Sequence, residues 1–223
     1  MTIVKICGLT RPVDIAPAIA AGATHLGFIF APASPRAVTA EEGVILRRVM
    51  PNDVTAVGVF KDQTVEEVLQ TAQTVGLQWV QLHGGFETRA IAALQAEGLR
   101  VIWAAPVAPN GTYGELPENA DLILLDTAEG GQFGGTGATF SWQDTPPPSQ
   151  PFLIAGGINP HNASRALGAL SSAGIDLSSG VEAAPGIKSH ALLRELGAAL
   201  HPVLQPLKRP ASQPAPTSSE VSS

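Results

Sequence analysis

Four side chains that can do chemistry each follow a short apolar run of the chain: Cys7, Arg36, His83 and Asp126. A thiolate can remove a proton and a protonated carboxyl group can donate one, so the cysteine and the aspartate could act as base and acid. A guanidinium can bind a carboxylate through paired hydrogen bonds. Each residue also has a structural explanation, because an isolated cysteine is most often buried packing and an aspartate before glycines often forms a turn.

Small residues follow two other runs, and a third small-residue stretch follows Asp126. Gly156-Gly157 and Ser179-Gly180 come after the last two runs, and a glycine-rich stretch, residues 134–137, comes after Asp126. Glycine lets the backbone approach an anion closely, and free backbone amides bind phosphate. The two pairs therefore predict a phosphate site, the alternative being ordinary turns. Residues 134–137 are not a Walker loop, because the Lys-Ser/Thr pair is missing.

Eight β-rich runs recur at similar spacing along the chain. Most are continuously apolar, as is typical of a parallel sheet whose outer face is covered. The runs span residues 3–7, 25–30, 55–60, 79–83, 101–107, 122–126, 152–155 and 174–178. All the chemical residues and glycine loops named above therefore stand at or just after the C-terminal ends of predicted strands.

Helix signals lie between most of these strands. Residues 39–42 and 64–67 read as capping boxes, in which a Thr hydroxyl and a Glu carboxylate each accept from a free backbone amide. Asn159 and Pro160 predict the start of a helix that runs to Leu167. The leucines of residues 188–200 share one face and predict the last helix. Pro17 predicts a kink or a late start in the first.

This alternation, in about 205 residues, predicts one domain, residues 1–205, folded as a (β/α)8 TIM barrel. A doubly wound open sheet is the alternative, but it needs a glycine fingerprint after the first strand, and Cys7-Gly8-Leu9-Thr10 is not one. Two connections lack helix signals: residues 115–119 can form at most one turn, and residues 142–148 cannot hold a long helix. The Pro- and Ser-rich residues 206–223 predict a disordered tail.

Composition excludes several classes of protein. Hydrophobic residues make up 44% of the 223-residue chain, too many for a disordered protein. The net charge of −6 and the absence of a long basic run exclude a dedicated nucleic-acid binder. A single cysteine excludes a disulfide framework, and no cluster has metal-ligand spacing. With no signal peptide and no apolar run of about 20 residues, we expect a cytoplasmic protein that does not enter membranes.

Taken in order, the segments at the strand ends resemble one known family, the phosphoribosylanthranilate isomerases of tryptophan biosynthesis. The resemblance covers roughly residues 1–200, and it depends on the ordered set rather than on any one tetrapeptide. Two positions depart from the family pattern, since Ser141 and Ser189 stand where members commonly have Asp. The matching segments are Lys5-Ile6-Cys7-Gly8, Gly27-Phe28-Ile29-Phe30, Ser34-Pro35-Arg36, Val57-Gly58-Val59-Phe60, Gln81-Leu82-His83-Gly84, Asp126 with residues 134–137, Ala155-Gly156-Gly157, Ser178-Ser179-Gly180-Val181-Glu182 and Pro185-Gly186-Ile187-Lys188.

The resemblance implies an Amadori rearrangement of N-(5-phosphoribosyl)anthranilate to 1-(2-carboxyphenylamino)-1-deoxyribulose 5-phosphate. It assigns Asp126 as the acid that opens the furanose ring, Cys7 as the base that removes the C2 proton, and Arg36 as the residue that binds the anthranilate carboxylate. His83, Gly156, Gly157, Ser179 and Gly180 are expected to bind the rest of this phosphosugar. No cofactor is needed, because the substrate amine forms its own Schiff base.

This chemistry predicts opposite pKa shifts for the base and the acid. The site should lower the pKa of Cys7 from about 8.5 and should raise that of Asp126 from about 3.9, mainly through burial. The pH profile of kcat/KM should then rise as Cys7 loses its proton and fall as Asp126 loses its own. Lys5 shares a strand face with Cys7, and we expect Asp176 to be its buried partner. Glu182 could support the site from the last loop.

Two other functions are compatible with such a barrel. One is the related aminoaldose isomerase of histidine biosynthesis, or an isomerase that takes both substrates, although those barrels have a carboxylate where Cys7 stands. The other is a barrel that binds a phosphosugar without catalysis, which the presence of both Cys7 and Asp126 disfavours. The sequence does not distinguish a monomer from a homodimer.

Overall fold

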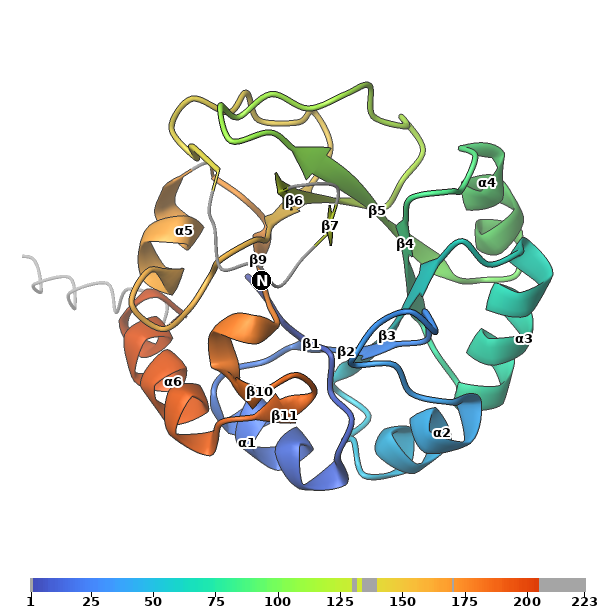
Figure 1. Ribbon diagram of the computed structural model, residues 1–223, viewed down its shortest axis with the longest axis horizontal. Helices are drawn as coiled ribbons and strands as arrows, with labels where there is room; N and C mark the ends of the chain where they lie inside the picture. The colour runs from blue at the N-terminus through green and yellow to red at the C-terminus, as the bar shows by residue number, and fades with distance from the viewer. Residues whose placement is uncertain (1, 130–131, 134–139, 170, 205–223) are drawn as a thin grey trace, which may run out of the picture.

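Eight parallel strands form a closed barrel in the computed structural model, which describes residues 2–129, 132–133, 140–169 and 171–204. Each of the first five strands pairs with the next, β6 pairs with β8, β8 with β9, and β9 returns to β1. The predicted barrel is therefore confirmed (Figure 1). The strands are β1 Ile3–Cys7, β2 His25–Ile29, β3 Thr55–Lys61, β4 Trp79–His83, β5 Arg100–Val107, β6 Leu122–Glu129, β8 Phe152–Ile154 and β9 Gly174–Leu177.

Helices surround this barrel on its outer side (Figure 1). Both predicted capping boxes form, with Thr39 starting α2 and Thr64 starting α3, and Gly76 ends α3 in the left-handed conformation at φ 74°. The α-helices are α1 Ile15–Ala20, α2 Ala40–Arg48, α3 Val65–Val75, α4 Arg89–Ala96, α5 Ala163–Ala169 and α6 His190–Leu204. Two short 3₁₀ helices are η1, Pro12–Asp14, and η2, Ser179–Val181.

The first helix starts late, as Pro17 predicts. A 3₁₀ turn precedes α1, so the proline falls in the first turn of the α-helix, where its missing N–H has no helical acceptor to lose. Helix α5 also starts later than predicted, at Ala163 rather than Pro160. The side chains of Asn159 and Asn162 bond backbone amides of this segment and hold a turn in front of the helix.

The last helix starts two residues later than predicted. Lys188 belongs instead to β11, Ile187–Lys188, which pairs in an antiparallel hairpin with β10, Glu182–Ala184. Ser189 then caps α6, because its hydroxyl accepts a hydrogen bond from Leu192 N at 3.3 Å. Serine is a good N-cap residue, so the departure from the family pattern at Ser189 leaves this helix start intact.

The barrel is covered by loops rather than helices where helix signals are missing, after β5 and after β6 (Figure 1). Phe140 and Trp142 are buried there, and Tyr113 and Leu116 pack against the same core. Strand β6 continues beyond its predicted end at Asp126 and forms a hairpin with β7, Gln132–Phe133. Residues 134–137 and 206–223 lie outside the described residues.

Alternation along the strands separates two cores. Side chains such as Ile6 and Phe28 point outward and form the large apolar cluster between barrel and helices. A smaller cluster that includes Val57, Ile102 and Leu124 fills the barrel interior. The interior changes to polar residues toward the C-terminal strand ends, where a ligand would enter. Within the described ranges, no helix has the length and apolar content needed to cross a membrane.

Candidate active site

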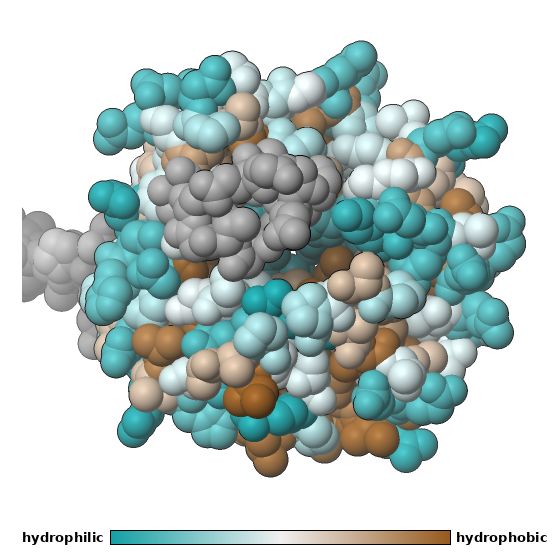
Figure 2. All heavy atoms as spheres, viewed as in Figure 1, coloured by the Kyte–Doolittle hydropathy of each residue, from teal (hydrophilic) through white to brown (hydrophobic). Residues whose placement is uncertain are grey.

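A pocket opens at the C-terminal ends of the strands, and the surface viewed along the barrel axis is hollowed there (Figure 2). Its lining includes four of the predicted residues, Cys7, Arg36, His83 and Asp126. An adjoining cavity is lined by the other four, Gly156, Gly157, Ser179 and Gly180. Asp126, Asp176 and Ser178 line both, so the eight predicted residues surround one continuous site.

Cys7 reaches the pocket from the end of β1, and its neighbour on β2 is a glycine. Cys7 is 5% exposed, and it stands opposite Gly27 in the β1–β2 register. A Cβ on Gly27 would come within 2.7 Å of the Cys7 Sγ. The absence of a side chain at Gly27 therefore leaves the space that the Cys7 thiol fills.

A buried ion pair lies below the thiol. Lys5 Nζ donates to Asp176 Oδ2 at 2.8 Å, which confirms the partner predicted for this lysine. The two residues face each other in the β1–β9 register, and the lysine is fully buried. Burial alone would lower the pKa of Lys5, but the charges of Asp176 and Cys7 and the hydrogen bonds to them together raise that pKa. Asp176 keeps its second oxygen, Oδ1, without a hydrogen-bond partner among the described residues.

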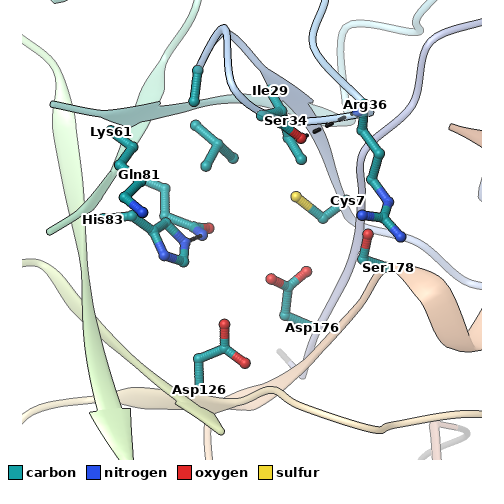
Figure 3. A pocket seen from close by; sticks show the side chains of 12 residues that line it. Cys7, Ile29, Ser34, Arg36, Lys61, Gln81, His83, Asp126, Asp176 and Ser178 are labelled. Carbon is teal, nitrogen blue, oxygen red and sulfur yellow. Dashed lines mark hydrogen bonds between the residues drawn. The ribbon is translucent and has the colours of Figure 1, made fainter. Parts of the chain in front are cut away.

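Asp126 stands across the pocket from Cys7, with Asp176 beside it (Figure 3). Its strand pairs with β5 through Thr127 but with β8 only through Leu125. Burial and, to a lesser degree, the negative charge of Asp176 raise the pKa of Asp126 to about 7 against the opposing effect of Lys5. The predicted rise in the pKa of Asp126 is confirmed.

The predicted fall in the pKa of Cys7 is wrong. Burial raises the pKa of the Cys7 thiol above its ordinary value, and this effect exceeds the lowering by Lys5. The charge of Asp176 raises it further. The physical reason is that Cys7 and Asp126 share one desolvated pocket, in which removing water disfavours both anions.

His83 enters the pocket from the end of β4. Burial, together with the charges of Lys5 and Lys61, lowers the pKa of His83 to about 3, so the ring is neutral near neutral pH. The Gln81 side-chain amide is in close contact with the His83 Nε2. A neutral imidazole can donate to or accept from a substrate hydroxyl, depending on its tautomer.

Arg36 lies on the side of Cys7 away from Asp126 (Figure 3). Its guanidinium is already paired. Its Nε and Nη2 donate to both oxygens of Glu182 at 2.8 to 3.1 Å. Gly8, at φ 74°, leaves room for the stem, since a Cβ there would come within 2.7 Å of Arg36 Cδ. In the described part of the chain, Nη1 donates to no residue, so that edge can take a ligand.

The two small-residue loops provide backbone donors. Gly156 and Gly157 have φ of 84° and 62°, which favour glycine. A Cβ on Gly180 would come within 1.9 Å of the Ile158 carbonyl oxygen. Within the described ranges, the backbone amides of Gly156, Gly157, Ser179 and Gly180 donate no hydrogen bond to the protein. Four unpaired amides lining one cavity suit an anion.

Sequence reasoning missed several lining residues. Asp176 was expected only as the partner of Lys5, and Gln81, Lys61 and Ser178 were not assigned to the site. The period of two along a strand would have found three of them, because Gln81-x-His83 and Asp176-x-Ser178 repeat the spacing of Lys5-x-Cys7. Among the described residues, no group of three His, Cys, Asp or Glu side chains could hold a metal ion.

The chain is similar to one protein family, to individual members of it and to solved structures. The family model for N-(5'-phosphoribosyl)anthranilate isomerase matches residues 4–198. The chain belongs to this family. A member from Rubrobacter xylanophilus is 39% identical over 199 residues, covering 87% of this chain and 96% of that protein. A member from Magnetococcus marinus is 37% identical over 202 residues, covering 88% and 94%.

Solved phosphoribosylanthranilate isomerases share the barrel. The crystal structure of the Thermus thermophilus isomerase has a TM-score of 0.80 and 35% identity, covering 91% of this chain and 100% of that one. A second isomerase structure, with a TM-score of 0.73, 29% identity and the same coverage, is a complex with reduced 1-(o-carboxyphenylamino)-1-deoxyribulose 5-phosphate. The expected family is therefore confirmed by sequence and by fold.

Proposed function

We propose that this chain catalyses the Amadori rearrangement of N-(5-phosphoribosyl)anthranilate to 1-(2-carboxyphenylamino)-1-deoxyribulose 5-phosphate in tryptophan biosynthesis. The observation that carries the proposal is one continuous site with three chemically distinct parts. Arg36 lies at one side, Cys7 and Asp126 face each other in the middle, and the free amides of the glycine loops line the far cavity. A substrate with a carboxylate, a sugar and a phosphate has groups in the same order.

Asp126 is the acid in this proposal. A pKa of about 7 leaves a large fraction of its carboxyl groups protonated near neutral pH, whereas an ordinary aspartate would be ionised. The proton goes to the furanose ring oxygen as the C1–O bond breaks, which leaves a Schiff base on the anthranilate nitrogen. Cys7, on the facing side of the pocket, then removes the C2 proton as a thiolate and gives an enolamine, which becomes the ketone.

Because the pKa values of both Asp126 and Cys7 are raised, they determine how much of the enzyme is in the protonation state that reacts. The acid must be protonated and the thiol ionised, but Asp126 has the lower pKa, so most singly protonated molecules carry the proton on Cys7 instead. The reactive form is the minor one of these two arrangements, and its fraction stays constant between the two pKa values. The kcat/KM profile still forms a bell, but the rising limb now belongs to Asp126 and the falling limb to Cys7.

The ends of the substrate are held by different means. Arg36 binds the anthranilate carboxylate with its free edge, His83 contacts the sugar, and Gly156, Gly157, Ser179 and Gly180 bind the phosphate through backbone amides. The neutral imidazole of His83 and the free amides support these assignments. We assign catalysis to the barrel domain, residues 1–205, acting in the cytoplasm as a monomer or homodimer; a relative from Thermotoga maritima is described as dimeric.

The function is tested by complementation of a tryptophan auxotroph that lacks this isomerase, followed by turnover of the anthranilate substrate. Positioned proton transfer contributes roughly a hundred- to ten-thousand-fold per group. Cys7→Ala and Asp126→Ala should each lower kcat by at least about a hundredfold and abolish complementation. Near-normal turnover by Cys7→Ala would show that the thiol serves only in packing and would refute this mechanism.

A further inference from the structure

We propose that Glu182 is a positioning residue, which holds the Arg36 guanidinium so that its free edge faces the carboxylate of the substrate. The inference rests on the proposed function, because it takes Arg36 as the carboxylate-binding residue. Glu182 lines neither part of the site, so it acts only through the arginine. Three observations carry the proposal: the geometry of the pair, the second cation on Glu182, and the charge of the cluster.

Glu182 accepts hydrogen bonds from one edge of the Arg36 guanidinium and leaves another edge available to a ligand. Arg36 donates from Nε at 2.9 Å and from Nη2 at 2.8 Å to the two oxygens of Glu182. A guanidinium has five N–H donors, so three remain, two on Nη1 and one on Nη2. Those three form the end of the fork, which is the edge that can grip a second carboxylate with two parallel bonds.

Glu182 is itself fixed by a second cation. Its Oε1 accepts from Lys188 Nζ at 2.8 Å and from the backbone amide of Gly186 at 3.3 Å. The lysine gives its other two protons to the carbonyl oxygens of Cys7, at 2.6 Å, and Ser178, at 3.2 Å. Lys188 therefore has no donor left for a ligand, and it ties Glu182 to the ends of β1 and β9, where the site is formed.

The backbone and the aliphatic stem of Arg36 are also fixed in place. Its backbone amide donates to Ser34 Oγ at 3.1 Å, and its stem lies over Gly8. A free arginine side chain keeps considerable rotamer entropy, which binding a ligand would have to remove. Glu182 removes that freedom before the substrate arrives, and preorganisation of this kind strengthens binding without adding a contact.

The charges of the cluster leave one positive charge unbalanced. Arg36 and Lys188 carry two positive charges against the single carboxylate of Glu182, and their side chains are 13%, 0% and 4% exposed. A substrate carboxylate on the free edge of Arg36 balances this charge in a place with little water. The same arrangement gives a test with a definite sign, because a role through charge alone predicts the opposite result from a role in positioning.

The test is titration calorimetry with two ligands that differ in one group. The first is reduced 1-(2-carboxyphenylamino)-1-deoxyribulose 5-phosphate, and the second is the same molecule without its carboxyl group. Hydrogen bonds between charged groups predict that the wild type binds the first about ten- to a hundredfold more tightly. Glu182→Gln and Glu182→Asp should reduce this preference to about threefold or less while affinity for the second ligand changes little. Turnover should show a raised KM with kcat largely kept.

Two variants of Glu182 distinguish a positioning role from an effect of its charge and from an effect on folding. Glu182→Asp keeps the charge but withdraws the oxygens by one methylene, and Glu182→Gln keeps the shape but loses the charge. The control is Glu87→Gln, which removes the same charge from an exposed pair in which Arg89 Nε lies 3.0 Å from Glu87 Oε2, the two side chains being 84% and 70% exposed. Cooperative melting of each variant verifies its fold, and the control should keep the wild-type preference.

Three results would overturn the inference. Glu182→Gln would bind the carboxylated ligand more tightly if Glu182 acted only by repelling it. Equal losses of affinity for both ligands would show a structural role, and an unchanged preference would show no role. A wild type that binds both ligands equally would instead remove the carboxylate-binding role of Arg36, which is a failure of the proposed function and is distinct from these three.

Discussion

In the proposed function, Arg36 binds the substrate carboxylate through the shape of its side chain as well as its charge. Its guanidinium is held on one edge by Glu182 and leaves a planar pair of donors on the other. Arg36→Ala should raise KM for the anthranilate substrate by about tenfold or more, since a hydrogen bond to a charged group contributes roughly 1.5–3 kcal/mol. Arg36→Lys should recover only part of this loss, because an ammonium cannot form the fork.

Steady-state kinetics of these two variants provide the measurement. An unchanged KM in Arg36→Ala would place the residue outside the substrate site. Full recovery by Arg36→Lys would show that a positive charge suffices and that the planar geometry held by Glu182 has no function.

At the same scale, the identities of the site residues and the raised pKa of Asp126 were predictable, but the pKa of Cys7 was not. Residue type and strand position together indicated Cys7, Arg36, His83 and Asp126, and the alternation of strand residues indicated the Lys5–Asp176 pair. The pKa of Cys7 depends on how much water the pocket excludes and on how near Lys5 and Asp176 lie. Those quantities follow from packing between strands far apart in sequence, so the predicted fall in the pKa was wrong.

The proposed phosphate-binding role belongs to the scale of elements, because we assign it to two loops rather than to side chains. Gly157, in the loop after β8, has φ of 62°. Valine is strained in this conformation and adds a side chain where an anion would approach. Gly157→Val should therefore lower affinity for a phosphate-bearing product analogue by at least about a hundredfold, the loss of several charge-assisted hydrogen bonds.

Gly98→Val is the matched control for that experiment. Gly98 has φ of 80°, lies just after α4, and has nothing within 4 Å of an added Cβ. It imposes similar backbone strain without touching the site, so its melting temperature should fall like that of Gly157→Val while its affinity stays normal. Calorimetry on both folded proteins measures affinity for the product analogue. Retained affinity in Gly157→Val would show that the phosphate does not bind at this loop.

Elements with local signals were predicted best. The capping boxes of α2 and α3 formed as expected, because a Thr hydroxyl and a Glu three residues later satisfy the first amides whatever surrounds them. The β10–β11 hairpin and the extension of β6 were missed, since pairing with another strand decides them. Helix α4 was not singled out, because Thr88 makes no side-chain cap there and its first turn lacks an acidic residue.

For the whole molecule, a polar layer inside the barrel is costly to keep. Asp126 has a pKa of about 7 in the folded protein and about 4 in the unfolded chain. Its folded pKa is the higher one, so its contribution to stability is present at low pH and is lost as pH rises toward 7. The difference corresponds to roughly 4 kcal/mol in the free energy of unfolding at pH 8.

Asp126→Asn should therefore stabilise the protein while abolishing its activity. Its melting temperature should exceed that of the wild type at pH 8, and the difference should shrink as pH falls toward 5. Asp53→Asn, at an exposed position, should leave the melting temperature unchanged at both pH values. Thermal unfolding of the three proteins across this range is the measurement, and a destabilised Asp126→Asn at pH 8 would contradict a carboxyl group with a raised pKa.

The pairing of a protonated Asp126 with an ionised Cys7 is tested most directly by the pH dependence of kcat/KM in the wild type and in Cys7→Ser. The wild-type profile should rise through about pH 7, as Asp126 titrates, level off above that pH, and fall only at a pH above the ordinary pKa of a thiol, as Cys7 titrates. Cys7→Ser should be at least about a hundredfold slower and should lose the falling limb, because a serine hydroxyl does not titrate in this range. A falling limb that persists in Cys7→Ser, or near-normal turnover in that variant, would contradict the role of Cys7 as the base.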